Sequence, residues 1–293
     1  MASIKGFLFT IGFLLFSVSL LSFIVIIFAT NYQEDKRVSE IGALDRINTL
    51  DSSAQNSLKK IFEAFSNINV SLYASNSNYV IFNETLPNDV KTFRTSLNDF
   101  KIFVEQNFPY ISINTSELND TIPLIVMPDK IVYHHVPIDN DATNQIIVTP
   151  EELTPNSRLR GYNVIVTHLP DIFCIPTTFP QGNNYFSLTI TASTIGIPGT
   201  PSTCSIPNQL IDPNLANIVQ IGGVIDPDSY LRIEVSNGGV LKIKNTQNSG
   251  VVATILRLDN IEGNQTKVML PDSIIRVSDP TLNIYKKGTA RIL

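Results

Sequence analysis

Histidine side chains are the first candidates for chemistry, and the chain has only three. His134 and His135 are adjacent in a run of β-branched residues that predicts a strand. Neighbouring residues on a strand point to opposite faces, so these two cannot easily ligate one metal ion. His168, with Asp171 nearby in sequence, could join one of them in a site of two histidines and one carboxylate. The pattern favours ordinary strand and loop histidines over a metal centre.

Two short acidic turns are the weak candidates for a hard cation such as calcium. One contains Asp139 and Asp141, and the other contains Asp226 and Asp228. Calcium needs several convergent oxygen ligands, and each turn supplies two carboxylates. Neither turn continues as an EF-hand loop, because the required glycine and the closing glutamate are missing. Aspartate is also common in turns that bind nothing, so the sequence predicts no cofactor.

No sequence motif of an enzyme active site occurs. The chain lacks the G-x-S-x-G elbow, the H-E-x-x-H helix, the phosphate-binding loop and the dinucleotide fingerprint. The only cysteines are Cys174 and Cys204, and either would need His168 as a base to act as a nucleophile. A disulfide between them, which needs an oxidising compartment, is favoured over two separate buried thiols. We therefore expect no enzyme activity.

Five Asn-x-Ser/Thr sites permit N-glycosylation: Asn69, Asn83, Asn114, Asn119 and Asn264. Chance alone produces about this many sites in a chain with 28 Asn and abundant Ser and Thr. The sites are therefore compatible with an exterior location but do not establish it.

Composition excludes several classes of protein. Lys and Arg number 21 against 26 Asp and Glu, a net charge of −5, and no stretch is strongly basic. The sequence therefore predicts no nucleic-acid partner. Two cysteines and three histidines are too few for a cysteine-rich zinc module or an iron–sulfur carrier.

Residues 7–29 form an uncharged apolar run, FLFTIGFLLFSVSLLSFIVIIFA. A helix of this length spans roughly 35 Å at about 1.5 Å per residue, enough to cross a hydrocarbon core of about 30 Å. We expect residues 1–29 to be a membrane anchor with the lipid bilayer around 7–29. The alternative is a cleaved signal peptide. The apolar region of a signal peptide is usually about 7–15 residues long, shorter than the run here, and Phe28 interrupts a small-residue cleavage site.

The orientation in the membrane is not decided by positive charges, which flank the apolar run on both sides. The predicted disulfide favours an exterior location for the residues beyond the anchor. The chain is therefore expected to be a single-pass cell-membrane protein whose C-terminal domain is extracellular.

Residues 30–120 predict a helical stalk with a small hairpin. An apolar stripe at helical spacing continues past the membrane segment, formed by Ile41, Leu44, Ile47, Leu50, Ala54, Leu58, Ile61 and Phe65. A break in the helix near Thr30–Asn31 is the alternative. We expect Leu58, Ile61 and Phe65 to be buried, and the part of the stripe nearer the membrane to be open for a partner. The sequence then predicts a hairpin over 69–82 and a second helix from about Val90 to Pro109.

Residues 121–293 predict a β-rich ectodomain. Short β-branched runs alternate with turn residues, and no helical pattern lies between them. The expected strands are 122–126, 130–135, 163–169, 185–193, 231–235, 240–244, 251–258 and 267–270. The segment 236–239 reads as a tight hairpin, and 286–288 as a turn before a final strand. The fold class is therefore α+β: a transmembrane helix continuing as an amphipathic helix, a second helix, and an antiparallel sheet or sandwich.

The leader and the order of elements together resemble type IV pilin-like proteins and related single-pass archaeal surface proteins. Lys5-Gly6-Phe7 stands directly before the apolar helix. The resemblance implies cleavage between Gly6 and Phe7, and assembly through the exposed part of the helix. The glutamate that most members carry at the fifth mature position is Ile11 here.

The predicted function is that of a membrane-anchored cell-surface structural or adhesion protein, with a pilin-like subunit as its more specific form. Its partners would be the bilayer, further copies of the chain or other envelope proteins. The alternative is a membrane-tethered extracellular hydrolase, built on Asp226, Asp228 and a histidine, or a ligand-binding ectodomain.

Overall fold

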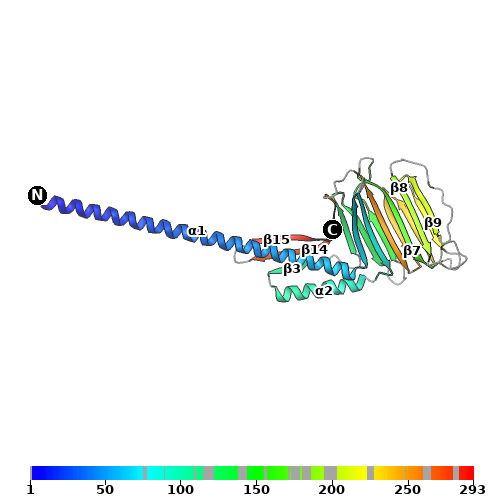
Figure 1. Cartoon of the computed structure of the whole chain (residues 1–293), viewed down its shortest axis with the longest axis horizontal. Helices are drawn as coiled ribbons and strands as arrows, with labels where there is room; N and C mark the ends of the chain where they lie inside the picture. The colour runs from blue at the N-terminus through cyan, green and yellow to red at the C-terminus, as the bar shows by residue number, and fades with distance from the viewer. Residues whose placement is uncertain are drawn as a thin grey trace.

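The computed structural model shows an elongated molecule, with one long helix leading into a β-rich head (Figure 1). It describes residues 2–74, 78–88, 90–108, 110–114, 122–137, 144–154, 157–170, 172, 179, 186–194, 203–222, 228–247, 249–259, 265–279 and 284–293. Helix α1 runs without a break over Ala2–Phe65, so the alternative break near Thr30–Asn31 does not occur. Within the described residues, this is the one helix long and apolar enough to cross a membrane. Its most apolar stretch of 18 residues is wholly exposed.

The second half of α1 buries one face against the rest of the chain. Its fully buried apolar residues are Ala43, Ile47, Ala54, Leu58 and Phe62. The predicted stripe is therefore only partly correct: Leu58 is buried and Ile61 is partly buried, but Phe65 is 40% exposed. Phe62 takes the expected place of Phe65, because its ring packs edge-on against Phe93 at a centroid distance of 5.9 Å. Phe62 and Phe65 lie on adjacent turns of the same apolar face, and periodicity alone does not tell which edge of that face is buried.

The predicted hairpin and second helix are confirmed. Strands β1 (Ile68–Ala74) and β2 (Asn78–Leu86) pair antiparallel, and α2 spans Val90–Asn107. Phe93, Leu97 and Val104 form the buried stripe of α2. The hairpin continues into the head, because β2 pairs on its other edge with β13 (Gly250–Leu258).

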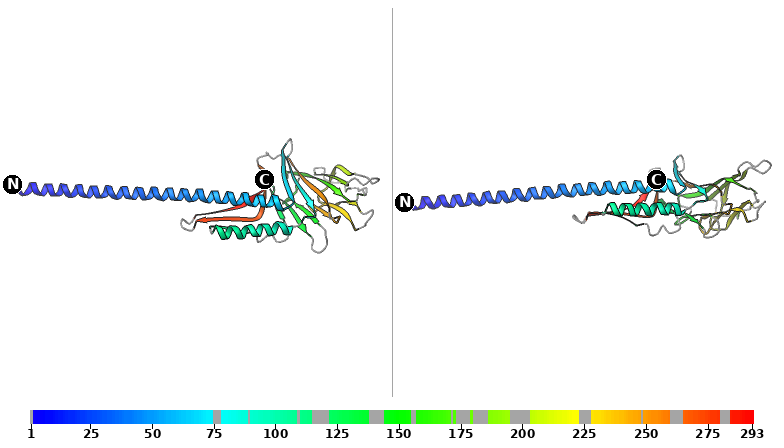
Figure 2. Two further views of the ribbon diagram at one scale, coloured as in Figure 1. Left: turned by 60° about the horizontal axis from the view of Figure 1, so that its bottom comes forward. Right: turned by 90° about the horizontal axis from the view of Figure 1, so that it is seen from below.

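The head consists of two sheets that share one apolar core. The first has the order β1-β2-β13-β7-β8-β9, and the second has the order β10-β11-β12-β6-β5-β4-β14-β15, with β3 paired to β14. Figure 2 shows the two layers and the extension of β14 and β15 along α1. The remaining bounds are β3 Ile111–Asn114, β4 Ile122–Met127, β5 Ile131–Pro137, β6 Asn144–Thr149, β7 Leu159–Leu169, β8 Phe186–Thr194, β9 Thr203–Ile211, β10 Asn217–Gly222, β11 Tyr230–Ser236, β12 Val240–Asn245, β14 Lys267–Asp279 and β15 Ile284–Arg291.

The α+β class and the mainly antiparallel pairing are confirmed, and among the described strands only β7 and β8 pair in parallel. The tight turn at 237–239 is also confirmed, since all three residues have positive φ angles. The sequence reading missed β3, β6, β9, β10 and the second half of β14. The turn predicted at 286–288 is wrong, because these residues lie inside β15, where Lys286 reaches an acid on α1 and Gly288 allows α1 to approach.

We call the assembly of α1 from Ala43 to Phe65, the following Ser66, α2, β3, β15 and the second half of β14 the neck. Strand β14 belongs to both parts of the molecule: Lys267–Met269 pair with β4 in the head, and the residues after an irregularity between Leu270 and Ile274 pair with β3 and β15. One continuous strand therefore joins the neck to the head.

Candidate functional site

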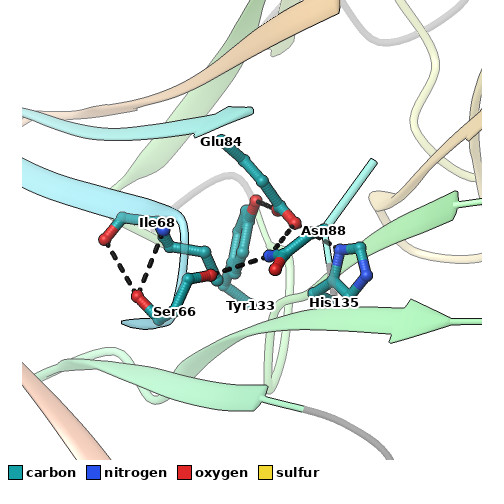
Figure 3. A network of polar contacts seen from close by, with 6 residues as sticks. All are labelled: Ser66, Ile68, Glu84, Asn88, Tyr133 and His135. Atoms are coloured by element: carbon teal, nitrogen blue, oxygen red, sulfur yellow. Dashed lines mark hydrogen bonds and ion pairs between the residues drawn. The ribbon is translucent and has the colours of Figure 1, made fainter. Parts of the chain in front are cut away.

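A buried polar network lies where α1 meets the head (Figure 3). It joins Ser66 after the end of α1, Glu84 on β2, Asn88 before α2, and Tyr133 and His135 on β5. All five residues are buried. Because β2 and β5 belong to different sheets, the network connects both sheets with the two helices.

Glu84 is the centre of this network. Its Oε2 accepts a hydrogen bond of 2.6 Å from the Tyr133 hydroxyl, and its Oε1 accepts one of 2.6 Å from Asn88 Nδ2. Nδ1 of His135 contacts the same Oε1. Asn88 Nδ2 also donates to the Ser66 carbonyl oxygen at 2.8 Å, and the ring of Phe82 stacks on Tyr133 at a centroid distance of 4.2 Å.

The electrostatics of the network keep Tyr133 protonated. Burial raises the pKa of Tyr133 well above its usual value, and the charge of Glu84 and the hydrogen bond to it raise this pKa further. A neutral phenol can donate to the carboxylate at any ordinary pH, whereas a phenolate would repel it. Among the described residues, His135 Nε2 has no hydrogen-bond partner.

This arrangement is suited to holding parts of the fold together. A buried carboxylate is stable only when hydrogen bonds replace its lost water, and Glu84 accepts one at each oxygen, from Tyr133 and from Asn88, with the ring of His135 in contact beside them. A reacting group must reach its substrate, but Glu84, Tyr133 and His135 are all fully enclosed. The geometry therefore supports a structural junction between head and neck.

The predicted histidine sites do not come together as a pair. His134 and His135 point to opposite faces of β5: His135 is fully buried, and His134 is half-buried, with its pKa lowered by burial. His168 is exposed near the end of β7, where its Nδ1 lies 3.0 Å from Thr167 Oγ1. Within the described part of the chain, no group of three or more His, Cys, Asp or Glu side chains could hold a metal ion.

Several predicted site residues lie outside the described residues, namely Asp139, Asp141, Asp171, Asp226, Cys174, Asn119 and Asn264. Asp228 is exposed just before β11, and Cys204 is buried on β9, so the disulfide stays a prediction. Asn69 and Asn83 are direct partners across the β1–β2 hairpin, and Asn114 is exposed at the end of β3. Gly6 and Phe7 lie within α1, and cleavage between them stays a prediction.

A second polar cluster, which the sequence analysis missed, attaches α1 to β15. Asp51 is almost fully buried on α1, and its Oδ2 lies 2.6 Å from Lys286 Nζ and 3.0 Å from Gln55 Nε2. Lys286 Nζ also donates to Asn48 Oδ1 at 3.1 Å. Helix and strand approach closely because residue 288 is glycine: a Cβ there would lie 2.9 Å from Gln55 Nε2 and 3.2 Å from Asp51 Oδ1.

Both clusters had a signal in the sequence. Asp51 lies on the apolar face of α1 between Ile47 and Ala54, and Glu84 follows Val80 and Phe82 on the inward face of β2. A charged residue at a core-facing position predicts a buried partner. The identity of that partner depends on which strands and helices meet, which periodicity alone does not give.

Comparison with known proteins finds no matching family model, no similar characterised protein and no similar solved structure. Functional conclusions therefore rest on the residues of this chain and their arrangement.

Proposed function

We propose that this chain is a single-pass, membrane-anchored cell-surface protein with a structural or adhesive role, acting as a subunit of a pilin-like surface structure. The observation that carries the proposal is the division of α1 into two halves. Apolar side chains from Phe16 to Phe28 are exposed, whereas the helix from Ala43 onward packs against the neck. Nothing in the described residues covers the first half, and a bilayer would.

The energetic argument favours lipid around this half of the helix. Each large apolar side chain left in water forgoes roughly 1.5–3 kcal/mol of burial free energy. A helix also satisfies its own backbone hydrogen bonds, as a membrane-spanning segment must. The rigid second half would then hold the head at a fixed distance from the membrane.

An assembly role is supported by exposed apolar residues of α1 that lie between the apolar half and the first turn of the neck. Val38, Ile41 and Leu44 remain exposed there, the latter two at 66% and 46%. A helix that acted only as a spacer would have no use for exposed Ile and Leu. Copies anchored in the same membrane would present this stretch to one another at the same height.

Protease treatment of intact cells tests the location. The proposal expects loss of the head while the anchor stays with the membrane fraction, and survival of the full chain beside a cleaved surface marker would contradict it. Mass spectrometry of the mature N-terminus separates the more specific forms. A start at Phe7 supports the pilin-like subunit, a start at Met1 or Ala2 supports an uncleaved anchor, and a start beyond Ala29 contradicts membrane anchoring.

A further inference from the structure

The outer face of the neck is a three-stranded ribbon formed by β3, β14 from Ile274 onward and β15 up to Thr289. Side chains alternate between its two faces. Ile111, Val277 and Lys286 point inward, since the first two are buried and Lys286 reaches Asp51 on α1. The residues between them point outward and are exposed. Figure 2 shows the ribbon lying along α1 and α2 and extending from the head toward the first half of α1.

Two positive side chains lie directly opposite each other on this outer face. Arg276 of β14 is the cross-strand partner of Lys287 of β15, and on its other side it faces Ser112 of β3. We call these three residues the basic row. Like charges at directly opposed positions destabilise a sheet. Neither Arg276 nor Lys287 forms an ion pair within the described residues, so no described carboxylate relieves this repulsion.

The head contains the same charge pair in a compensated form. Arg232 and Lys244 are direct partners on β11 and β12. Here Glu234 lies 3.2 Å from Arg232 Nη2 and faces Lys242 across the strands. The ammonium of Lys244 also lies 5.8 Å from the ring centroid of Tyr230. Among the described residues, the head therefore supplies a compensating partner for its charge pair and the neck does not.

Two exposed tyrosines lie in the row next to the basic row, both on the same side of it. Ser278 donates its backbone N–H to the carbonyl oxygen of Tyr110 and is the cross-strand partner of Tyr285. Tyr110, Ser278 and Tyr285 therefore form the next outward row, two residues along each strand from the basic row. Tyr110 is 45% exposed and Tyr285 is 78% exposed. The outer face thus presents two cations beside two aromatic rings.

The height of this face above the membrane limits its partner. Lys286, next to Lys287, contacts Asp51, and from Ala29 to Asp51 the helix rises roughly 33 Å at about 1.5 Å per residue. Charges on lipid headgroups are screened over about 8 Å at physiological ionic strength. The face therefore lies beyond the electrostatic reach of the chain's own bilayer, so headgroups of that bilayer are not its partner.

We propose that the basic row and its two tyrosines bind an acidic polysaccharide, a polymer of uronic or similarly charged sugars. The carboxylates would pair with Arg276 and Lys287 and relieve their mutual repulsion, and the sugar rings would pack on Tyr110 and Tyr285. The flat, open face of the ribbon suits an extended polymer better than a compact ligand, which needs a concave site. The biological setting rests on the proposed cell-surface function, but the binding itself is a property of the purified chain.

The test is the binding of polygalacturonate to the full chain in phosphatidylcholine nanodiscs, measured by biolayer interferometry, with neutral dextran and single-stranded DNA as comparison polymers. The variant Arg276→Gln/Lys287→Gln should bind polygalacturonate about tenfold more weakly. The matched control Arg232→Gln/Lys244→Gln removes the same residue types from the same cross-strand arrangement. It should bind like the unmodified chain, and circular dichroism should show both variants folded.

Each other result overturns the proposal. Absence of polygalacturonate binding by the unmodified chain removes its basis, and equal weakening by the control shows attraction to net charge alone. Tighter binding of single-stranded DNA than of polygalacturonate assigns the face to another polyanion, and loss of self-association in the Arg276/Lys287 variant assigns it to a contact between copies. Protease treatment of cells reads the location independently, so binding in vitro with an intracellular head would contradict the proposed function and not the binding site.

Discussion

Replacement of Tyr133 by phenylalanine removes one atom from the centre of the head–neck junction. The lost hydroxyl donates to Glu84 Oε2 at 2.6 Å, and both side chains are fully buried. Hydrogen bonds to a charged group contribute about 1.5–3 kcal/mol, and here the carboxylate oxygen would be left without that donor in a site closed to water. We expect Tyr133→Phe to lower the free energy of unfolding by about 2–3 kcal/mol.

Tyr162 provides a matched control. It is also fully buried, and its hydroxyl donates at 2.7 Å to the backbone carbonyl oxygen of Gly239, a neutral acceptor. Its ring packs edge-on against Phe186, so the aromatic contact survives the same substitution. A neutral hydrogen bond contributes only about 0.5–1.5 kcal/mol. Tyr162→Phe should therefore cost clearly less stability than Tyr133→Phe.

Thermal unfolding of the full chain in detergent, followed by far-ultraviolet circular dichroism, measures the difference. For a folded unit of about 150–250 residues, 1 kcal/mol corresponds to a shift of roughly 2–4 °C in Tm. Tyr133→Phe should lower Tm by roughly 4–12 °C and Tyr162→Phe by less than about half of that. An equal or larger shift for Tyr162→Phe would refute the argument that the Glu84 charge makes this junction stabilising.

The same contacts lead to three further predictions. Gly288→Ala should displace Gln55 Nε2, which lies 2.9 Å from the new Cβ, and weaken its hydrogen bond to Asp51. Because Nε2 is the end of a flexible side chain, the cost should be less than about 1 kcal/mol, seen as slightly faster hydrogen exchange in β15. Because burial raises the pKa of Tyr133 and Tyr162, only the unfolded chain releases these protons near pH 10, so stability should fall as the pH rises above about 10. Tyrosinate absorbance should then rise in a step that coincides with unfolding. Leu44→Asp, at an exposed position, should impair assembly without changing Tm, whereas Phe62→Asp in the core should prevent folding, as size-exclusion chromatography and circular dichroism would show.

The periodicity of apolar residues predicted most helices and strands of this fold, but not which of them pack against one another. The hairpin over 69–82 and the helix from Val90 were found because their apolar residues repeat at the periods of a strand and a helix. The second half of β14 was missed because it forms the neck, where packing on α1 determines its structure. The sequence predicted that Phe65 is buried, whereas the side chain that packs on Phe93 belongs to Phe62.

The candidate site was less accessible to sequence reasoning because it depends on pairing between distant segments. Tyr133 and Glu84 are 49 residues apart in sequence, and Lys286 and Asn48 are 238 apart. Strand alternation already places Glu84 and His135 on inward faces, with Val80, Phe82 and Tyr133. A charged or polar residue on such a face marks a buried site, but its partner becomes known only when the order of the strands is known.

The two polar clusters together fix the direction of α1 as well as its position. Ser66 joins the helix end to the junction around Glu84, and Asp51 joins the helix to Lys286 on β15. The two attachment points are separated along the axis by roughly 22 Å at about 1.5 Å per residue. A single attachment would let the helix pivot, whereas two so far apart resist rotation of the head about its end. Since β14 runs from the neck into the head sheet, a force on the first half of α1 would pass through paired strands rather than through a flexible linker. Such mechanical continuity would suit the proposed surface subunit, and the buried charges at both attachment points are what provides it.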